Sequence, residues 1–286
     1  MPPPSPTVAS WELGLRLRQR RAQLGVEVKT ITDQLGFTRN YWSAVEHERK
    51  ILATDKLHHV LDLLKYDDDE RTELIELREA AKQRGWWSDY SALFNDELLR
   101  LFGLEHGAQS IRTYESLLIP GLLQTPDYAR ALVTASISVR PVEVDQRVAA
   151  RLRRQERLSG DDPLQLTAVI SEAALLQQVG GPQVLREQLR HLAAVVADHP
   201  DTIELRVIPF TAPARNVFGA STFHLIDFAD ARLPTLAWQE TATVMGVLDK
   251  DTQVRELHFT YAEALQVSLS PADSLQLVSE SIRKEA

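Results

Sequence analysis

Two glycines, Gly25 and Gly36, divide residues 13–46 into three short segments with helical periodicity. Glycine ends a helix readily because it adopts the left-handed conformation at no steric cost. Apolar residues recur at helical spacing in the first two segments: Leu13, Leu17 and Leu24, then Val28, Ile31 and Leu35. Thr38 is a typical N-cap for the third segment, and Phe37 before it can pack on the first helical turn. A helix, a short glycine turn and a capped helix form the spacing of a helix-turn-helix.

The third segment carries side chains suited to reading DNA. In a helix-turn-helix, the first residues after the cap of the second helix reach base edges in the major groove. Arg39 can donate a fork of hydrogen bonds to guanine O6 and N7, and Asn40 can pair with adenine N6 and N7. Ser43 lies one turn further on, within reach of a base or a phosphate. Trp42 and Val45 fall on the opposite face and are expected in the core.

The candidate DNA contacts extend to polar and basic residues outside that helical face. Tyr41 is expected to be exposed beside the DNA backbone, and nearby basic residues are expected to contact phosphates, which would make binding salt-sensitive. The full candidate set is Thr38, Arg39, Asn40, Tyr41, Ser43, Lys29, Arg16, Arg20, Arg21 and Arg49. The alternative is a small helical bundle with solvated charges, since helical pairs are common and motif matches misfire.

Residues 13–46 resemble the Cro/repressor (XRE) class of helix-turn-helix regulators. The resemblance rests on Leu13-Gly14, Leu17-Arg18, Arg21, Gly25, Leu35-Gly36-Phe37-Thr38-Arg39 and Val45-Glu46. Glu46 falls on the acidic residue that this class usually has near the end of its recognition helix. Val28 departs from the class, which usually has Gln there, and Thr32 stands where Ala is usual. The resemblance implies a DNA-binding regulator that acts as a dimer on paired half-sites, in which Val28 does not provide the anchor that the usual Gln supplies.

Charge is distributed unevenly along the chain. The net charge is −8, which by itself argues against a nucleic-acid partner. Between Trp11 and Lys65, however, 10 basic residues stand against 7 acidic ones, which is a net charge of +3 and leaves −11 for the remainder. Attraction to phosphate depends on where the positive charge lies. We therefore expect a basic N-terminal module that attracts DNA and an acidic body that repels it.

Composition and the first residues bear on location. The chain has no cysteine, which excludes disulfides, thiolate metal sites and a cysteine nucleophile. Residues 1–7 are proline-rich and lack the basic start and apolar stretch of a signal peptide, and residues 1–10 are expected to form a disordered tail. No apolar run approaches the roughly 20 residues that span a bilayer. We expect a cytoplasmic protein with no membrane partner.

Two further helices are predicted before the second domain, at 55–64 and from the acidic run 67–70 to Gln83. His58 and His59 cannot share a metal ion, because neighbours on a helix point about 100° apart. The sequence Gly85-Trp86-Trp87 marks a junction between domains, where hydrophobic packing is favoured over a ligand-stacking surface. We therefore assign the helix-turn-helix DNA-binding domain to residues 11–84.

Residues 85–286 mix predicted strands with predicted helices. Strands are expected at 164–170, 203–209, 221–228 and 233–238, and residues 111–118 are expected to be extended or irregular. Helices are expected at 93–101, from Pro126, and at 142–158, 172–179, 182–198, 250–265 and 271–284. The predicted fold class is α+β, with an all-α helix-turn-helix bundle followed by a larger α+β domain.

The second domain lacks the sequence signatures of common enzyme sites. It contains no His-Glu-x-x-His, no phosphate loop, no nucleophile elbow and no dinucleotide-binding glycine fingerprint. Gly180-Gly181-Pro182 could bind an anion at a helix start, although a plain turn is the commoner structure. The arginine-rich helix 142–158 could bind phosphate or an acidic partner, or could be a solvated face. We expect no enzymatic activity, no cofactor and no metal.

Several motifs of the second domain resemble the C-terminal domain of actinobacterial antitoxin-like regulators, the group that includes WhiJ-like proteins. They are Tyr114-Glu115, Ile119-Pro120-Gly121-Leu122-Leu123-Gln124-Thr125, Tyr128-Ala129, Arg154-Gln155, Glu172-Ala173-Ala174-Leu175, Gly180-Gly181, Gln188-Leu189 and Val207-Ile208-Pro209-Phe210. The motifs are specific in combination and weak singly. The resemblance implies a transcription regulator that is often paired with a small partner protein, and it assigns no site residue in this domain.

Three functions remain open from the sequence. The first is a DNA-binding regulator that acts as a repressor and binds double-stranded DNA as a homodimer. In this case residues 85–286 sense an effector or bind a partner. The second is an antitoxin-like interaction protein that mainly captures a small partner protein. The third is a small-molecule receptor in which a pocket in the α+β domain shifts DNA affinity. Recovery of a small protein in a pull-down would favour the second, and a ligand-dependent thermal shift would favour the third.

Overall fold

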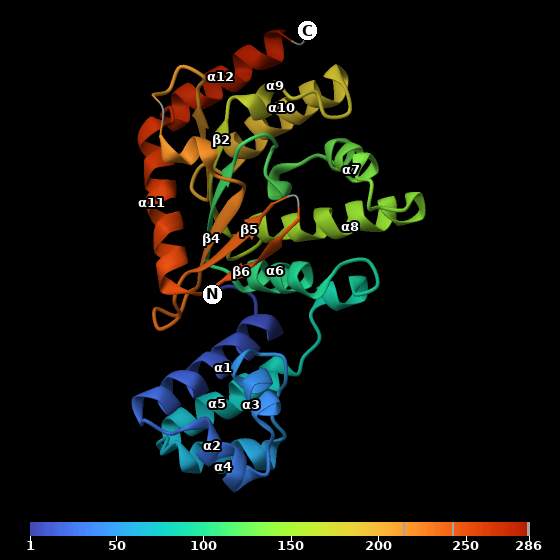
Figure 1. The fold of residues 1–286 in the computed structure, drawn as a ribbon. Coiled ribbons are helices and arrows are strands. Elements are labelled where there is room, and N and C mark those ends of the chain that lie inside the picture. Colours follow the sequence, from blue (N-terminus) through green and yellow to red (C-terminus); the bar gives the residue numbers. More distant parts are fainter. Residues whose placement is uncertain (214, 242, 285–286) are drawn as a thin grey trace. The chain divides into compact units, whose positions relative to one another are not determined.

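The structure is a computed structural model that describes residues 1–213, 215–241 and 243–284. The chain divides into two compact units, one comprising Pro3–Ser88 and the other Asp89–Ala286 together with Met1–Pro2 (Figure 1). The first unit is helical and the second combines a six-stranded mixed sheet with helices. The predicted α+β class is therefore confirmed. The first unit extends to Ser88, four residues beyond the end that the sequence predicted.

The N-terminal unit contains five α-helices: α1 Pro6–Gln23, α2 Val28–Leu35, α3 Arg39–Glu46, α4 Thr54–Leu63 and α5 Asp68–Ala81. Helix α1 begins earlier than the sequence predicted, because Ser5 caps it by accepting a hydrogen bond from the amide of Val8 at 3.3 Å. Pro6 occupies the first helical position, where its fixed φ favours the helix and its missing N–H has no partner to lose. The prediction of a disordered tail over residues 1–10 was therefore wrong for residues 6–10.

One hydrophobic core joins the five helices of the N-terminal unit. Trp42 and Leu17 are fully buried in it, and the other buried members are Leu13, Ile31, Val45, Leu52, Leu57, Val60, Leu61, Leu64, Tyr66 and Leu74. Asp67 caps α5 in a capping box: it accepts from the amide of Glu70 at 2.8 Å, and Glu70 accepts from the amide of Asp67 at 3.2 Å. The acidic run 67–70 is thus the helix start that the sequence predicted.

A short 3₁₀ helix, Trp86–Tyr90, follows the five helices. Trp87 is buried and packs edge-on against Trp86, with ring centroids 5.9 Å apart. A Cβ on Gly85 would lie 2.3 Å from the indole of Trp87, so only glycine fits there. The burial of Trp87 supports packing rather than a surface for stacking ligands.

The second unit is built on the strand order β3-β2-β1-β4-β5-β6. Strands β1 Ser110–Glu115, β2 Gln165–Ser171 and β3 Ile203–Ile208 are parallel. Strands β4 Phe223–Asp227, β5 Leu236–Glu240 and β6 Met245–Leu248 extend the sheet antiparallel from β1. Of residues 111–118, which could be strand or irregular from the sequence, 111–115 belong to β1, one of the two central strands. The sequence did not predict β6, a four-residue strand of half-buried residues at the edge of the sheet.

Helices connect and cover the sheet. Helices α7 Pro126–Ala135 and α8 Val144–Gln155 connect β1 to β2, and α9 Ala173–Leu176 and α10 Pro182–Asp198 connect β2 to β3. Helix α11 Asp251–Val267 packs on one face through a core that contains Tyr114, Phe223 and Tyr261. Helices α6 Asp96–Gly107, α7 and α8 lie on the other side of the sheet from α11 (Figure 1). The chain ends with α12 Pro271–Lys284, which packs on α10 and β3.

Strand alternation gives the two faces of the sheet different chemistry. Tyr114 and Phe223 point toward α11, whereas the residues next to them along β1 and β4, including Thr113, Glu115 and His224, point to the face of α8. His224 Nδ1 lies 2.7 Å from the hydroxyl of Thr113, and burial lowers the pKa of His224 to about 3. The α8 face therefore holds buried polar groups at the middle of the sheet.

Candidate nucleic-acid interface

Helix α3 starts as the sequence predicted. Gly36 ends α2 in the left-handed conformation, with a φ of 69°, and Thr38 accepts a hydrogen bond from the amide of Tyr41 at 3.1 Å. The ring of Phe37 stacks on Trp42, with centroids 6.5 Å apart, which is the hydrophobic contact that a staple requires. The cap and the staple together fix the first turn of α3.

The first turn of α3 presents its polar side chains to solvent. Thr38, Arg39 and Asn40 are exposed, and the side chains of Arg39 and Asn40 form no hydrogen bond or ion pair with the described residues. Tyr41 is half-buried rather than exposed, because its ring lies 4.7 Å from that of Phe37. Ser43 is also half-buried, one turn along the helix. Arg39 and Asn40 are thus the side chains of α3 that are most available to a ligand.

The rest of α3 is held against α1. Trp42 and Val45 are buried, as predicted. Glu46 is also buried and forms a two-pronged ion pair with Arg21: Nε lies 2.5 Å from Oε1 and Nη2 3.2 Å from Oε2. A Cβ on Gly14 would lie 3.0 Å from the carbonyl oxygen of Val45, so the two helices approach closely. The acidic residue of the XRE resemblance therefore anchors the helix from within the protein.

The predicted phosphate contacts on α1 have other partners in the structure. In addition to its ion pair with Glu46, Arg21 donates a hydrogen bond from Nη1 to the carbonyl of Val26 at 3.3 Å. Arg20 donates to the carbonyls of Leu64 at 3.1 Å and Lys65 at 2.7 Å, where it satisfies the end of α4. These two guanidinium groups are committed to holding helices together. Periodicity places them on a cationic side of α1, but it does not reveal the carbonyl and carboxylate groups that face that side.

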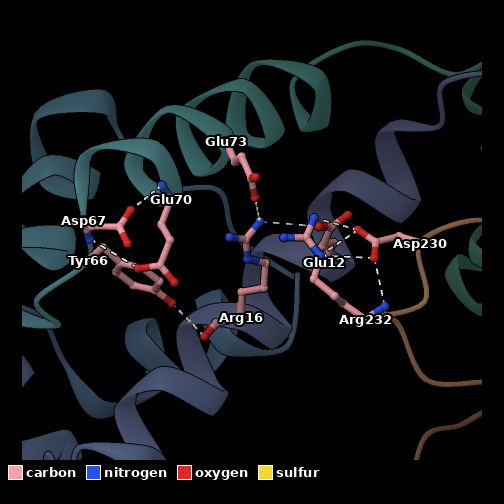
Figure 2. A network of polar contacts seen from close by, with 8 residues as sticks. All are labelled: Glu12, Arg16, Tyr66, Asp67, Glu70, Glu73, Asp230 and Arg232. Atoms are coloured by element: carbon pink, nitrogen blue, oxygen red, sulfur yellow. Dashed lines mark hydrogen bonds and ion pairs between the residues drawn. The ribbon is translucent and has the colours of Figure 1, made fainter.

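Arg16 is likewise committed to the N-terminal unit. Its Nη1 donates to Glu73 of α5 at 2.8 Å, and its carbonyl accepts a hydrogen bond from the hydroxyl of Tyr66 at 2.8 Å (Figure 2). Burial raises the pKa of Tyr66 to about 12, so the hydroxyl keeps its proton and remains a donor at neutral pH. Arg16 therefore ties α1 to α5.

Five basic side chains around α3 have no carboxylate partner among the described residues. The predicted contacts Lys29 and Arg49 are exposed and form no ion pair there. Lys50 and Lys56, which the sequence analysis missed, lie over the rings of Tyr41 and Phe37 at 5.7 and 5.9 Å. We call Lys29, Arg39, Arg49, Lys50 and Lys56 the unpaired cations of the α3 region. Aromatic residues flanking the cap of α3 are the signal that could have drawn attention to the two lysines.

The positive charge of the N-terminal unit is local. Residues 3–88 contain 14 Lys and Arg and 14 Asp and Glu, so the complete unit is neutral, because α5 and its cap add acidic residues. Arg16, Arg20 and Arg21 face acceptors inside the unit, whereas the unpaired cations of the α3 region face solvent or aromatic rings. The sequence-based value of +3 for the segment 11–65 does not describe the folded unit.

The two departures from the XRE pattern fit the core. Thr32 is buried, and its hydroxyl donates to the carbonyl of Lys29 at 2.9 Å, so the polar atom that replaces a methyl group is satisfied. Val28, at the start of α2, is half-buried and packs on the hydrophobic core. Both substitutions leave the helix pair intact.

Each of the two units matches a protein-family model. A model described as a helix-turn-helix domain matches residues 12–74, so the N-terminal unit is a helix-turn-helix domain, which supports a DNA-binding regulator. A second model, described as a domain of unknown function (DUF5753), matches residues 98–280, more than half of the chain. The chain belongs to the DUF5753 family. No curated protein and no solved structure matches this chain.

The DUF5753 domain contains a turn, 119–125, that is held by two glutamine side chains. Gln188 donates to the carbonyl of Leu123 at 2.7 Å and accepts from the amide of Thr125 at 2.7 Å. Gln155 donates to the carbonyls of Gly121 and Gln124 at 3.1 and 2.7 Å. Motifs that are far apart in sequence, 119–125, 154–155 and 188–189, therefore meet at one turn and hold it in place.

The arginine-rich helix α8 is directed inward. Arg154 forms two hydrogen bonds of 2.7 Å with Glu105, and both side chains are about nine-tenths buried. Arg157, just beyond α8, donates to three carbonyls, those of His106, Ala108 and Asp162. Arg147 donates to the carbonyl of Leu93 at 2.5 Å and to Glu143. These arginines are cross-links of the domain rather than a solvated face.

Two other possible sites from the sequence are the Gly180-Gly181 turn and the histidine pair on α4. Gly180 and Gly181 have φ values of 75° and 92°, and the amide of Gly181 donates to the carbonyl of Gln178 in a turn that precedes α10. His58 and His59 are exposed on α4. Among the residues that the structure describes, no group of three or more His, Cys, Asp and Glu side chains could hold a metal ion. Over the same residues, no helix is long and apolar enough to cross a membrane.

Proposed function

We propose that this protein is a sequence-specific transcription regulator that places α3 in the major groove of double-stranded DNA. The observation that carries the proposal is the start of α3: Arg39 and Asn40 are exposed, without a side-chain partner among the described residues, on a capped, firmly anchored helix of a helix-turn-helix domain. Such residues read base edges in this kind of domain. Arg39 would donate to guanine and Asn40 would pair with adenine.

Contacts to the DNA backbone fall to other residues around α3. Thr38, Tyr41 and Ser43 lie along the first turns of the helix, and Lys29 and Arg49 supply positive charge. Lys50 and Lys56 join this set, because each lies over an aromatic ring beside the start of α3. We exclude Arg16, Arg20 and Arg21 from this set, because their guanidinium groups already have partners. An arginine bound to a carboxylate would have to give up that contact to reach a phosphate.

The finer assignment follows from the resemblances. We propose a member of the XRE class that acts as a cytoplasmic repressor and binds as a homodimer to half-sites about one helical turn apart or a multiple of it. The motifs of residues 114–210 support an antitoxin-like, WhiJ-like regulator whose second unit binds a small partner protein or an effector. We propose no enzymatic activity, since no catalytic signature occurs in the sequence.

The test is DNA selection followed by affinity measurement. The full chain is used to select its preferred duplex from a random pool, and affinity for that duplex is measured by fluorescence anisotropy at fixed salt. Arg39→Ala is expected to weaken binding by ~1–3 kcal/mol and to relax preference at one base pair. Arg130→Ala is the matched control. Arg130 lies in the second unit, where it forms only an exposed ion pair with Asp145. Equal affinity and equal preference of Arg39→Ala and the control would refute the proposed placement of α3.

A further inference from the structure

A pocket of about 460 Å³ lies in the DUF5753 domain at the C-terminal end of β1. Its size is within the range of small-molecule sites, which is roughly 300–1,000 Å³. One part of the wall is apolar and is formed by Leu117, Leu118, Leu132 and Val179. The polar part includes Glu115, the last residue of β1, and Thr222, which precedes β4. The pocket thus combines an apolar wall with one acidic group.

Glu115 is incompletely satisfied. Its side chain is buried, and Oε2 accepts a hydrogen bond from the hydroxyl of Thr222 at 2.7 Å. Its Oε1 accepts no hydrogen bond from the described residues, and no cationic group among them lies within ion-pair distance. A carboxylate that is largely removed from water and has one hydrogen-bond partner is stabilised by a further donor or cation. Glu115 lines the pocket, where a ligand could supply the missing partner.

The charges that face Glu115 do not neutralise it. Two arginines of α8 attract it: Arg154 is committed to Glu105, and the hydrogen-bond partner of Arg151 is the uncharged amide of Gln124, at 2.5 Å. Glu240 of β5 repels it. Burial, reinforced by Glu240, raises the pKa of Glu115 to about 7, against the opposing effect of the Thr222 hydrogen bond and the two arginines. The described residues therefore leave the carboxylate without a direct cationic partner.

We propose that this pocket binds a small organic cation with an apolar body and one protonated amine, whose ammonium group pairs with Oε1 of Glu115. The leucines and Val179 would cover the apolar body, and Thr222 would hold the carboxylate in place. A small-molecule amine is favoured over an anion because the ionisable group that lines the pocket is an acid, while Arg151 and Arg154 are not among the lining residues. This inference does not depend on DNA binding by α3.

The affinity for such a cation should rise with pH. An ammonium group binds the ionised form of Glu115. That form predominates at pH values above the pKa of this residue, which is about 7. At lower pH the carboxyl group must release its proton before it can pair, and this requirement weakens apparent affinity. Because alkylamines remain protonated throughout, affinity should fall by about tenfold between pH 8 and pH 6. A ligand that instead accepts a hydrogen bond from the protonated acid would show the opposite slope.

Calorimetric titration of the full chain with three indole compounds tests the proposal. The compounds share one apolar body: tryptamine carries an ammonium group, tryptophol a hydroxyl group and indole-3-propionate a carboxylate. At pH 8 tryptamine is expected to bind at least tenfold more tightly than tryptophol, and indole-3-propionate more weakly than both. Glu115→Gln should remove the advantage of tryptamine and leave the affinity for tryptophol unchanged. Glu187→Gln, on the exposed face of α10, is the matched control.

Several outcomes would overturn the proposal. Equal binding of the three compounds would show a merely apolar pocket, and tighter binding of indole-3-propionate would show that the arginines dominate. Failure of all three compounds to bind the folded chain would show that the pocket does not take this class of ligand. The pH series on the unchanged chain requires no variant, so the test holds even if Glu115→Gln does not fold. None of these results bears on the DNA affinity of Arg39→Ala, which tests the other proposal separately.

Discussion

Helices α3 and α8 both carry basic residues that suggest DNA binding, but the structure uses those residues in opposite ways. On α3, Arg39 is exposed and has no partner among the described residues. On α8, Arg154 is buried against Glu105, and Arg147 is bound to a carbonyl and a carboxylate. The number of arginines therefore does not identify a nucleic-acid surface. What matters is whether each guanidinium group already has acceptors within the protein.

The same distinction applies inside the N-terminal unit. Arg20 and Arg21 of α1 serve as connectors to α4 and α3, whereas Lys50 and Arg49, just after α3, are exposed. An arginine whose hydrogen bonds are satisfied keeps its charge, but its donors are occupied and its position is fixed. Available donors, rather than net charge, distinguish the α3 region from α1 and α8.

Separation of the two units should give the largest effect. A fragment that ends at Ser88 is expected to bind DNA, with weaker sequence selectivity if the proposed homodimer forms through the second unit. A fragment that begins at Asp89 is expected not to bind, because Arg147 and Arg154 of α8 already have partners and the fragment contains 18 basic against 26 acidic residues. Titration of both fragments with duplex DNA over a range of salt concentrations measures this. Binding by the second fragment alone would transfer the DNA surface to α8.

Removal of the α8 cross-link should affect stability but not DNA recognition. Arg154→Met leaves Glu105 buried without its partner, and the removal of one member of such a pair costs about 3–5 kcal/mol of the free energy of unfolding. Arg130→Met, which breaks an exposed pair with Asp145, should cost at most about 1 kcal/mol. Urea unfolding measures both values. Similar costs for the two variants would contradict the role of Arg154 as a cross-link.

Removal of the α3 cap should have a smaller, local effect. Thr38→Ala deletes the acceptor of the Tyr41 amide and should lower the stability of the N-terminal unit by about 1 kcal/mol. Thr38→Ser keeps the hydroxyl oxygen and is the matched control. Thermal unfolding of the two variants gives the comparison. If Thr38→Ala and Thr38→Ser unfold together, the hydrogen bond of the cap contributes little to α3.

The smallest expected effect is on salt dependence. If Lys50 contacts a phosphate, Lys50→Gln should reduce the slope of log affinity against log salt concentration by about 0.9. Arg20→Gln should leave that slope unchanged, because Arg20 is bound to the carbonyls at the end of α4. Anisotropy titrations over a series of salt concentrations resolve the difference. A lower slope for Arg20→Gln would show that Arg20 leaves those carbonyls for DNA.

Local signals in the sequence determined much of the fold. Gly36 and Thr38 predicted the turn and the start of α3, and Pro182 predicted the start of α10. These signals are local because glycine, proline and capping residues act on their own backbone. The start of α1 was misread because Pro6 looked like part of a tail rather than the first residue of a helix. The edge strand β6 was missed because four half-buried residues leave a weak alternation.

The sequence by itself determined the helix-turn-helix, the α+β class and the candidates Arg39 and Asn40, because each depends on residues close together in the chain. The tertiary structure alone decided which arginines are available. Arg21 meets Glu46 and Arg154 meets Glu105 across 25 and 49 positions of sequence. It also placed Glu115 in a pocket beside Thr222, 107 positions away. Whether a charged group is available or satisfied depends on neighbours that only folding brings together, and periodicity carries no information about them.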